Sequence, residues 1–132
     1  MFDFINTINL DILCITQYNV VNGELMSNES FENAILELRR GVIVLAVLSK
    51  LGEEQYGYSL INGLKEQGFE IDQGTLYPLL RRLETQGLLN SKWRIEADRP
   101  RRYYSLSAEG RVLLPRLKNE WNSLVLIMKK ML

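Results

Sequence analysis

The chain has 132 residues, of which 46% are hydrophobic and 24% are charged, and its formal net charge is zero. This composition predicts one folded domain with a sizeable core plus a tail or an extra helix, and it excludes a disordered chain. The chain has no histidine and a single cysteine, so it lacks the commonest metal ligand and general base. It also lacks a Gly-rich phosphate loop and a serine nucleophile motif. We therefore expect no metal, no cofactor and no enzymatic activity.

The charges are distributed unevenly along the chain. Residues 1–38 contain six acidic residues and no Lys or Arg, whereas residues 39–132 contain all 16 bases and ten acids, a net charge of +6 (16 − 10). Binding to nucleic acid depends on local charge rather than on the total, so the zero net charge does not argue against it. No apolar run reaches the roughly 18 residues that cross a membrane, and Asp3 stands where a signal peptide carries positive charge. We expect a cytoplasmic protein without a membrane partner.

Residues 1–29 are predicted to form a weakly structured N-terminal extension. They are acidic and rich in Asn and Ile, without clear periodicity, so a short strand and a short helix both remain open. The residues before Met26 can be encoded by purine-rich codons that resemble a bacterial ribosome-binding site, which gives the hypothesis that Met26 is the natural start. An ordinary flexible extension is the alternative. Cys14 has no basic neighbour to activate it and is expected to be an incidental thiol.

Helical periodicity begins after Ser30, which we predict to be the N-cap of a first helix. We expect this helix to end at Gly52. The β-branched residues between positions 42 and 47 also fit a strand, but the periodicity on both sides favours a helix. A second helix is predicted over about 56–67, and Gly68 ends it.

A third helix is predicted to begin between Asp72 and Gly74 and to end at Gly87. Pro78 is tolerated only near the first turn, where backbone N–H groups lack partners. Leucines at i, i+3, i+4 and i+7 form one apolar face, namely Leu76, Leu79, Leu80 and Leu83. When this face is turned inward, the outward positions are Gly74, Pro78, Arg81 and Thr85.

Two runs that resemble strands follow, at about 88–95 and 102–106, with a polar turn over 96–101. Three helices followed by a two-stranded hairpin is the element order of a winged helix-turn-helix. The predicted fold class is therefore mainly α with a small β-hairpin (α+β). It comprises a DNA-binding domain over 30–106 and a C-terminal dimerisation helix over 107–132.

In this arrangement the third helix enters the major groove of double-stranded DNA. Gln73 and Thr75 lie at the N-terminal end of the helix, where base edges are usually met, and Tyr77 and Arg82 flank the outward positions. Arg can read guanine and Gln can read adenine, while Thr and Tyr can reach a phosphate or a thymine methyl. The alternative is a solvated polar face on an ordinary helical hairpin.

The hairpin is the wing of this arrangement. Within 92–102, Glu96 and Asp98 are opposed by five bases, Lys92, Arg94, Arg99, Arg101 and Arg102, which gives a net charge of +3 (5 − 2). A cluster of Arg on a protruding hairpin suits contact with phosphates or the minor groove, so we predict that Lys92, Arg99, Arg101 and Arg102 bind DNA. The alternative is a solubilising loop tip in which one Arg pairs with Asp98.

Four segments carry a family resemblance: GYSL at 57–60, GTLYPLLRRLE at 74–84, GL at 87–88 and RRYYSLSAEG at 101–110. This ordered pattern, within a match over about 35–128, resembles the PadR family of bacterial transcription regulators. The resemblance implies a dimeric winged-helix repressor that binds palindromic operator DNA, often near stress, detoxification or multidrug-efflux genes. It also implies frequent control by a small aromatic or cationic effector.

The resemblance further implies roles for single residues. The recognition helix would contribute Thr75, Tyr77 and Arg81 to DNA binding, and the wing would contribute Arg101 and Arg102. Two further residues, Tyr56 and Tyr58, would lie near the DNA backbone. The chain departs from the family in three places. Gln73 stands where a small residue is frequent, Pro115 falls inside a helix that is usually uninterrupted, and residues 1–30 have no counterpart in the short members.

A last helix is predicted to begin at Ser107 and to run to the chain end. Apolar residues recur in it at spacings of 4, 3, 4 and 3, namely Leu117, Trp121, Leu124, Met128 and Met131. This is a heptad pattern, which favours a partner helix. We predict a homodimer interface of Leu117, Trp121, Leu124 and Met128 that completes a dimer core with the first helix. The alternative is packing on the same domain. Pro115 should kink or restart the helix.

Trp121 is also a candidate for effector binding. In the similar multidrug-binding branch of the family, a Trp at this place comes from both subunits and sandwiches flat drugs. Aromatic faces hold planar or cationic ligands well. The alternative is a large core or interface residue.

A second class of function fits the same fold, a winged-helix protein-interaction module without specific DNA binding. The outward Arg81 and the arginine-rich wing favour DNA, because an adaptor has no need to cluster Arg there. Specific, salt-sensitive binding to duplex DNA would separate the two classes.

Overall fold

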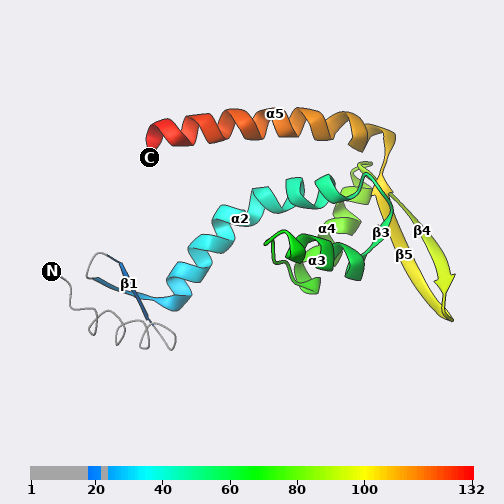
Figure 1. The fold of residues 1–132 in the computed structure, drawn as a ribbon, viewed down its shortest axis with the longest axis horizontal. Coiled ribbons are helices and arrows are strands. Elements are labelled where there is room, and N and C mark those ends of the chain that lie inside the picture. Colours follow the sequence, from blue (N-terminus) through cyan, green and yellow to red (C-terminus); the bar gives the residue numbers. More distant parts are fainter. Residues whose placement is uncertain (1–17, 22–23) are drawn as a thin grey trace. The chain divides into compact units, whose positions relative to one another are not determined.

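The computed structural model describes residues 18–21 and 24–132 (Figure 1). Backbone contacts divide the chain into a first unit that ends at Val42 and a second unit from Ile43 to Leu132. Each unit is described by itself. Cys14 and Asp3 lie outside the described residues.

In the first unit, an antiparallel hairpin of β1 (Tyr18–Val21) and β2 (Glu24–Ser27) precedes helix α2 (Asn28–Lys50). For residues 1–29, the sequence alone allows either a short strand or a short helix. The first helix begins earlier than predicted, because the Ser27 Oγ accepts the Ser30 N–H at 3.2 Å. Ser27 is therefore the N-cap, and the prediction of Ser30 is wrong. Two serines three residues apart both fit the N-cap pattern, and the strand that ends at Ser27 decides between them.

Helix α2 is continuous to Lys50, so the strand alternative for 42–47 is wrong. Near its end, the side chains of Val47 and Leu48 are completely buried, and so is that of Leu51 in the turn that follows. Gly52 lies in this turn, which confirms the predicted end of the first helix. The buried C-terminal turns of α2 form one wall of the core of the second unit.

Helices α3 (Gly57–Glu66) and α4 (Gln73–Thr85) form a helix-turn-helix pair. Gly68 follows α3 with φ of +84°, and Gly87 follows α4 with φ of +79°. Glycine adopts this left-handed backbone without steric cost, so both predicted helix ends are confirmed. Asp72 is the N-cap of α4, since its carboxylate accepts the Thr75 N–H at 2.7 Å. Hydrogen bonds from the Thr75 side chain and from the Thr75 backbone lower the pKa of Asp72.

The start of α4 at Gln73 confirms the predicted start between Asp72 and Gly74. Pro78 is the sixth residue of the helix, beyond the first four backbone N–H groups, which lack partners within it. A proline there removes the hydrogen bond to the Gly74 carbonyl and crowds that carbonyl. The helix nevertheless continues to Thr85, because four leucines on its inner face are buried: Leu76, Leu79, Leu80 and Leu83. Packing of this face therefore outweighs one lost backbone hydrogen bond.

The wing is longer and its turn tighter than predicted. Strands β4 (Leu89–Glu96) and β5 (Arg99–Leu106) are antiparallel, with Glu96 opposite Arg99. The turn consists of Ala97 and Asp98 alone, with φ of +47° and +61°, as in the type I′ turn that suits a two-residue hairpin. The predicted polar turn over 96–101 is wrong, because positions 99–101 belong to β5.

Pro100 is compatible with this strand because of its place in the sheet. The strand order is β3-β5-β4, and β3 (Gln55–Tyr56) pairs only with Tyr104 and Tyr103. Beyond these residues β5 has a free edge, where a proline costs no ladder hydrogen bond. Two residues are too few to show strand periodicity, so the sequence predicted a two-stranded hairpin where a three-stranded sheet forms.

Helix α5 (Ala108–Met131) begins directly after β5. The Ser107 Oγ accepts the Gly110 N–H at 3.0 Å and donates to the Gly87 carbonyl at 2.6 Å, which confirms the predicted cap. The helix runs through Pro115 without the predicted restart. No helix in the described part of the chain is long and apolar enough to cross a membrane.

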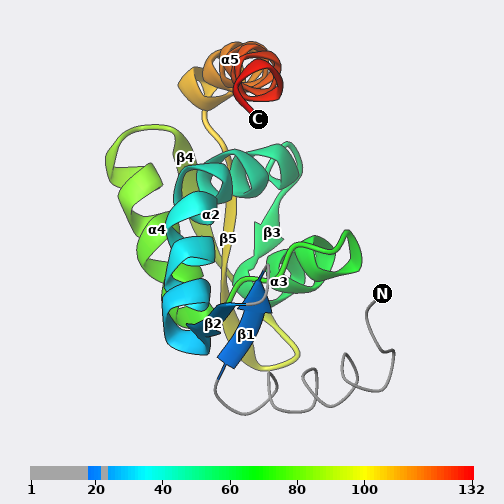
Figure 2. The ribbon, with the colours of Figure 1, turned by 90° about the vertical axis from the view of Figure 1, so that its left-hand side faces the viewer.

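The core of the second unit lies between α2, the helix pair α3–α4 and the sheet. Besides the four leucines of α4, its buried apolar residues are Val47, Leu48, Leu51, Leu60, Leu64, Leu89, Tyr104 and Leu106. Leu114 and Leu117 of α5 pack against this cluster. Figure 2 shows the pair α3–α4 beside the sheet, and Figure 1 shows the hairpin β4–β5 projecting from it.

Replacing Gly110 by Ala should destabilise the chain by roughly 2 kcal/mol, the usual cost of forcing extra volume into a packed site. A Cβ at this position would lie 2.2 Å from the Leu88 carbonyl oxygen, so backbone has to move. Thermal unfolding followed by circular dichroism measures the change. Gly63→Ala is the matched control, because a Cβ there meets nothing closer than 4.0 Å. The control should raise the free energy of unfolding by about 0.5–1 kcal/mol, and equal melting temperatures for both variants would contradict the prediction.

Candidate nucleic-acid interface

The outward face of α4 is the first part of the candidate interface. With the four leucines buried, the exposed residues of this helix are Gln73, Gly74, Thr75, Pro78, Arg81, Arg82 and Thr85. This is the orientation that the leucine spacing predicted. Arg81 and Arg82 form no ion pair with any residue of the described segments. The side of α4 that faces solvent therefore carries polar residues at its N-terminal end and two cations toward its C-terminal end.

Tyr77 differs from its neighbours because it is half-buried. Its ring lies against Gly57 at the start of α3, and a Cβ on Gly57 would come within 2.5 Å of the Tyr77 Cε1 and Oη. A side chain at position 57 would require the Tyr77 ring to move. Tyr77 thus positions α4 on α3, a contact that the leucine spacing did not reveal, and Tyr58 is exposed on α3.

The strand register gives the wing two chemically different faces. Residues paired across the strands share a face. One face is formed by three such pairs, Ser91 with Tyr104, Trp93 with Arg102, and Ile95 with Pro100. The opposite face is formed by three further pairs, Lys92 with Tyr103, Arg94 with Arg101, and Glu96 with Arg99. Most of the predicted cations of the wing therefore lie on one face, and Arg102 lies on the other.

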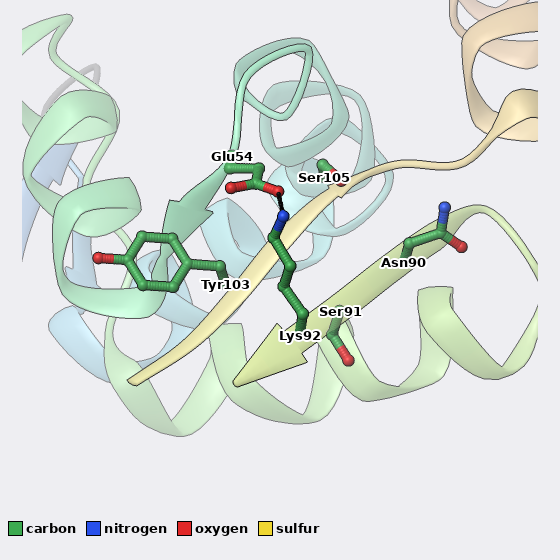
Figure 3. A pocket seen from close by; sticks show the side chains of 6 residues that line it. All are labelled: Glu54, Asn90, Ser91, Lys92, Tyr103 and Ser105. Atoms are coloured by element: carbon green, nitrogen blue, oxygen red, sulfur yellow. Dashed lines mark ion pairs between the residues drawn. The ribbon is translucent and has the colours of Figure 1, made fainter. Parts of the chain in front are cut away.

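On the cationic face, Glu54 from the turn before β3 binds two of the bases. The Lys92 Nζ lies 2.7 Å from the Glu54 carboxylate, and Arg94 donates to the same carboxylate. Figure 3 shows Lys92 reaching Glu54 across a pocket of about 210 Å³. The hydrogen bond from Lys92, together with the charge of Arg94, lowers the pKa of Glu54. Lys92 is thus already paired within the chain.

Arg101 and Arg99 extend this cationic face toward the tip of the wing. The Arg101 guanidinium lies 4.4 Å from the centre of the Tyr56 ring and 3.4 Å from the Glu96 carboxylate. The Tyr56 ring makes an edge contact with Tyr103, with 5.6 Å between ring centres. Arg99 is exposed and has no ion-pair partner in the part of the chain that the structure describes.

On the other face, Arg102 connects the wing to α4. Its guanidinium lies 2.6 Å from the Glu84 carboxylate, and its Nε donates to the Ser91 Oγ at 3.0 Å. Ser91 also donates to Glu84. The rings of Trp93 and Tyr104 lie 5.8 and 5.4 Å from the same guanidinium. The sequence predicted a DNA-binding Arg102, whereas in the structure its charged atoms are engaged by α4.

Glu84 was not among the residues singled out from the sequence. It belongs to segment 74–84, which carries part of the family resemblance, but a single glutamate on an amphipathic helix does not by itself indicate a function. An acidic residue three positions after Arg81 would have suggested only a local pair. The partner, Arg102, lies 18 positions away, and strand register was needed to bring the two together.

A groove of about 310 Å³ separates α4 from the wing. Three arginines and four aromatic residues contribute to its lining, namely Arg81, Arg101, Arg102, Tyr56, Tyr77, Trp93 and Tyr104. Cations and aromatic rings in one groove fit an anionic backbone with apolar sugars. Among the described residues there is no cluster of His, Cys, Asp or Glu that could hold a metal.

A helix-turn-helix whose second helix faces solvent, followed by a basic hairpin, is the winged helix-turn-helix of DNA-binding transcription regulators. The model of the PadR-like family of transcriptional regulators matches residues 44–116. The chain belongs to this family, whose members are regulators and not enzymes.

Individual relatives agree with this assignment. Transcriptional regulator Rv3488 of Mycobacterium tuberculosis is 38% identical over 79 residues, which cover 59% of this chain and 74% of that protein. A PadR family regulator from Eggerthella lenta has a similar solved structure, with 42% identity and a TM-score of 0.73 over 79% of this chain and 93% of that one. A PadR-like transcription factor from Bacteroides fragilis is 31% identical, with a TM-score of 0.64 over 76% and 99% of the two chains.

Replacing Glu84 by Gln should weaken binding to duplex DNA about fivefold, equivalent to about 1 kcal/mol for a partly exposed ion pair. The loss of a negative charge near a polyanion would by itself strengthen binding, so the sign of the change separates positioning from charge. Fluorescence anisotropy with labelled duplex measures it.

The matched control is Asp98→Asn at the tip of the wing, which removes the same charge. Asn accepts the positive φ of this position, so the turn is preserved, and affinity should rise slightly. Tighter binding of both variants would contradict a positioning role for Glu84.

Proposed function

We propose that this regulator is a repressor that binds palindromic operator DNA as a homodimer, in the cytoplasm where its DNA lies. The observation that carries the proposal is the exposed basic face of α4 beside the groove that the wing completes. In each protomer α4 enters the major groove and the wing contacts the neighbouring backbone. A dimer on a promoter would block access of the polymerase.

Within the proposed complex, residues divide by the chemistry that they offer. Gln73, Thr75 and Arg81 are exposed at positions of α4 that reach base edges, where Gln suits adenine and Arg suits guanine. Arg82 and Tyr58 are exposed and suit phosphate oxygens. Two wing residues, Arg99 and Arg101, add further cations for the backbone.

Helix α5 supports the dimer. Trp121, Leu124 and Met128 are 40%, 46% and 45% exposed on one side of this helix, which is more apolar surface than a solvated helix needs. Leu117, predicted to share this row, packs against the core of its own chain, so the proposed interface rests on the other three. A two-fold dimer presents two recognition helices about 34 Å apart, one turn of DNA.

Release by a small aromatic or cationic effector completes the proposal. The Trp121 ring is partly exposed within the same apolar row, and two such rings across a two-fold axis would face each other. An effector between them favours one arrangement of the subunits and shifts the population away from the state that binds DNA. A coupling of about 1–3 kcal/mol is enough for a useful switch.

Selection of random duplex DNA on the purified chain should recover one palindromic motif at two salt concentrations. With that duplex, the double variant Arg99→Ala and Arg101→Ala should lower the slope of log K against log salt by about 3.6, since it removes two phosphate contacts from each protomer of the dimer and each contact contributes about 0.9. Arg116→Ala on α5, which removes one charge away from the candidate interface, is the control and should leave the slope unchanged. Recovery of no motif would instead favour the protein-interaction module.

Replacing Leu124 by Glu should convert the dimer to a monomer, because a charge buried without a partner opposes association strongly. Light scattering coupled to gel filtration reads the mass directly. Leu126→Glu is the matched control, since Leu126 is 62% exposed but lies off the 121–124–128 row. A variant at position 124 that stays dimeric would show that α5 does not form the interface.

A further inference from the structure

The side of the wing that carries Arg102 also carries an apolar surface, formed by Trp93, Ile95 and Pro100. Trp93 is 65% exposed and Ile95 is 80% exposed, and Ile95 lies directly opposite Pro100 in the strand register. We call this surface the apolar face of the wing. None of the three residues belongs to the core of the chain.

Exposed apolar residues on a projecting hairpin are costly without a partner. A two-stranded ribbon has free backbone edges, so Trp and Ile on its surface favour aggregation unless something covers them. The cationic face of the same hairpin shows that charged residues are compatible with these strands. Neither the folding of the chain nor its solubility explains why these apolar residues are exposed, so the apolar face requires a functional explanation.

The surroundings of the apolar face define the chemistry of its partner. Trp93 and Pro100 line the groove beside α4 together with Arg81, Arg101 and Arg102. An apolar strip bordered by arginines fits a partner that presents phosphates at its rim and apolar groups within. A second wing does not have this chemistry, because it would oppose arginine with arginine. The minor groove of DNA has it, with deoxyribose C–H groups between two rows of phosphates.

We propose that the apolar face of the wing packs against the deoxyribose wall of the minor groove beside the site read by α4. This inference rests on the proposed function and assigns a part of it to residues that are not cationic. Protein side chains that enter the minor groove are frequently apolar. The wing then binds DNA through two separable contributions, arginine with phosphate and apolar side chain with sugar.

The recognition helix sets the position of this surface. Glu84 of α4 holds the Arg102 guanidinium at 2.6 Å, and that guanidinium lies 5.8 Å from the centre of the Trp93 ring. The Trp93 ring is thus supported from α4 and not from the hairpin alone. Correct docking of α4 in the major groove would bring the apolar face to the adjacent minor groove.

Salt dependence distinguishes the two contributions. Phosphate contacts release counterions and weaken as salt rises, whereas apolar contacts release none. Replacing Ile95 by Ser should therefore lower affinity for the selected duplex by about a hundredfold at every salt concentration, as expected for loss of one buried aliphatic side chain, about tenfold, in each protomer of the dimer. The slope of log K against log salt should stay at the value of the unmodified chain.

The experiment measures anisotropy of the labelled duplex at three salt concentrations for the unmodified chain, Ile95→Ser and Val112→Ser. Val112 is 65% exposed on α5, so the last variant removes an exposed aliphatic residue away from the wing and should bind normally. An unmodified chain that binds no duplex overturns the proposed function and this inference together. Normal binding by Ile95→Ser, or a loss that comes with an altered slope, overturns the inference alone.

A second readout uses the fluorescence of Trp93 in a Trp121→Phe chain, where Trp93 is the one remaining tryptophan. Bound duplex should protect this ring from quenching by acrylamide. Protection supports the inference independently of any effect of Ile95→Ser on folding. Equal quenching with and without bound duplex overturns it and leaves the apolar face open to a protein partner.

Discussion

The pairing of Glu84 with Arg102 connects the recognition helix to the wing, and the geometry of the candidate interface depends on it. Helix α4 and the wing can contact the same stretch of DNA at the same time only if the distance between them is fixed. Here one guanidinium lies between them, hydrogen bonded to Glu84 and Ser91 and placed beside the rings of Trp93 and Tyr104. The side chains of the pair are 34% and 27% exposed and so partly shielded from solvent, which makes the contact worth more than a fully exposed one.

The same contact changes how the basic residues of the wing are understood. The sequence shows five bases in a short hairpin, four of which are predicted to bind DNA. In the structure, Lys92 and Arg94 share Glu54, Arg102 is held by Glu84, and Arg99 extends freely from the tip. A count of basic residues therefore overstates the charge available to DNA, and internal carboxylates give several of these cations a structural role.

Much of the fold could be predicted because it follows from local chemistry. The leucine spacing gave the inner face of α4, and glycines at 68 and 87 marked helix ends. The strand β3 could not be found, because two residues carry no periodicity and form a strand only through pairing with β5. The turn at Ala97 and Asp98 was missed because neither residue demands a positive φ. Contacts such as Glu84 with Arg102 depend on strand register, which a single sequence does not determine.

The junction between β5 and α5 has a mechanical consequence. Ser107 alone separates the strand from the helix, and it is hydrogen bonded to Gly87 and Gly110. The preceding Leu106 N–H donates to the Leu51 carbonyl at 2.8 Å. These hydrogen bonds and the single connecting residue make the junction rigid. No flexible linker can absorb a rotation of α5, so such a rotation would be transmitted directly to β5, the central strand of the sheet.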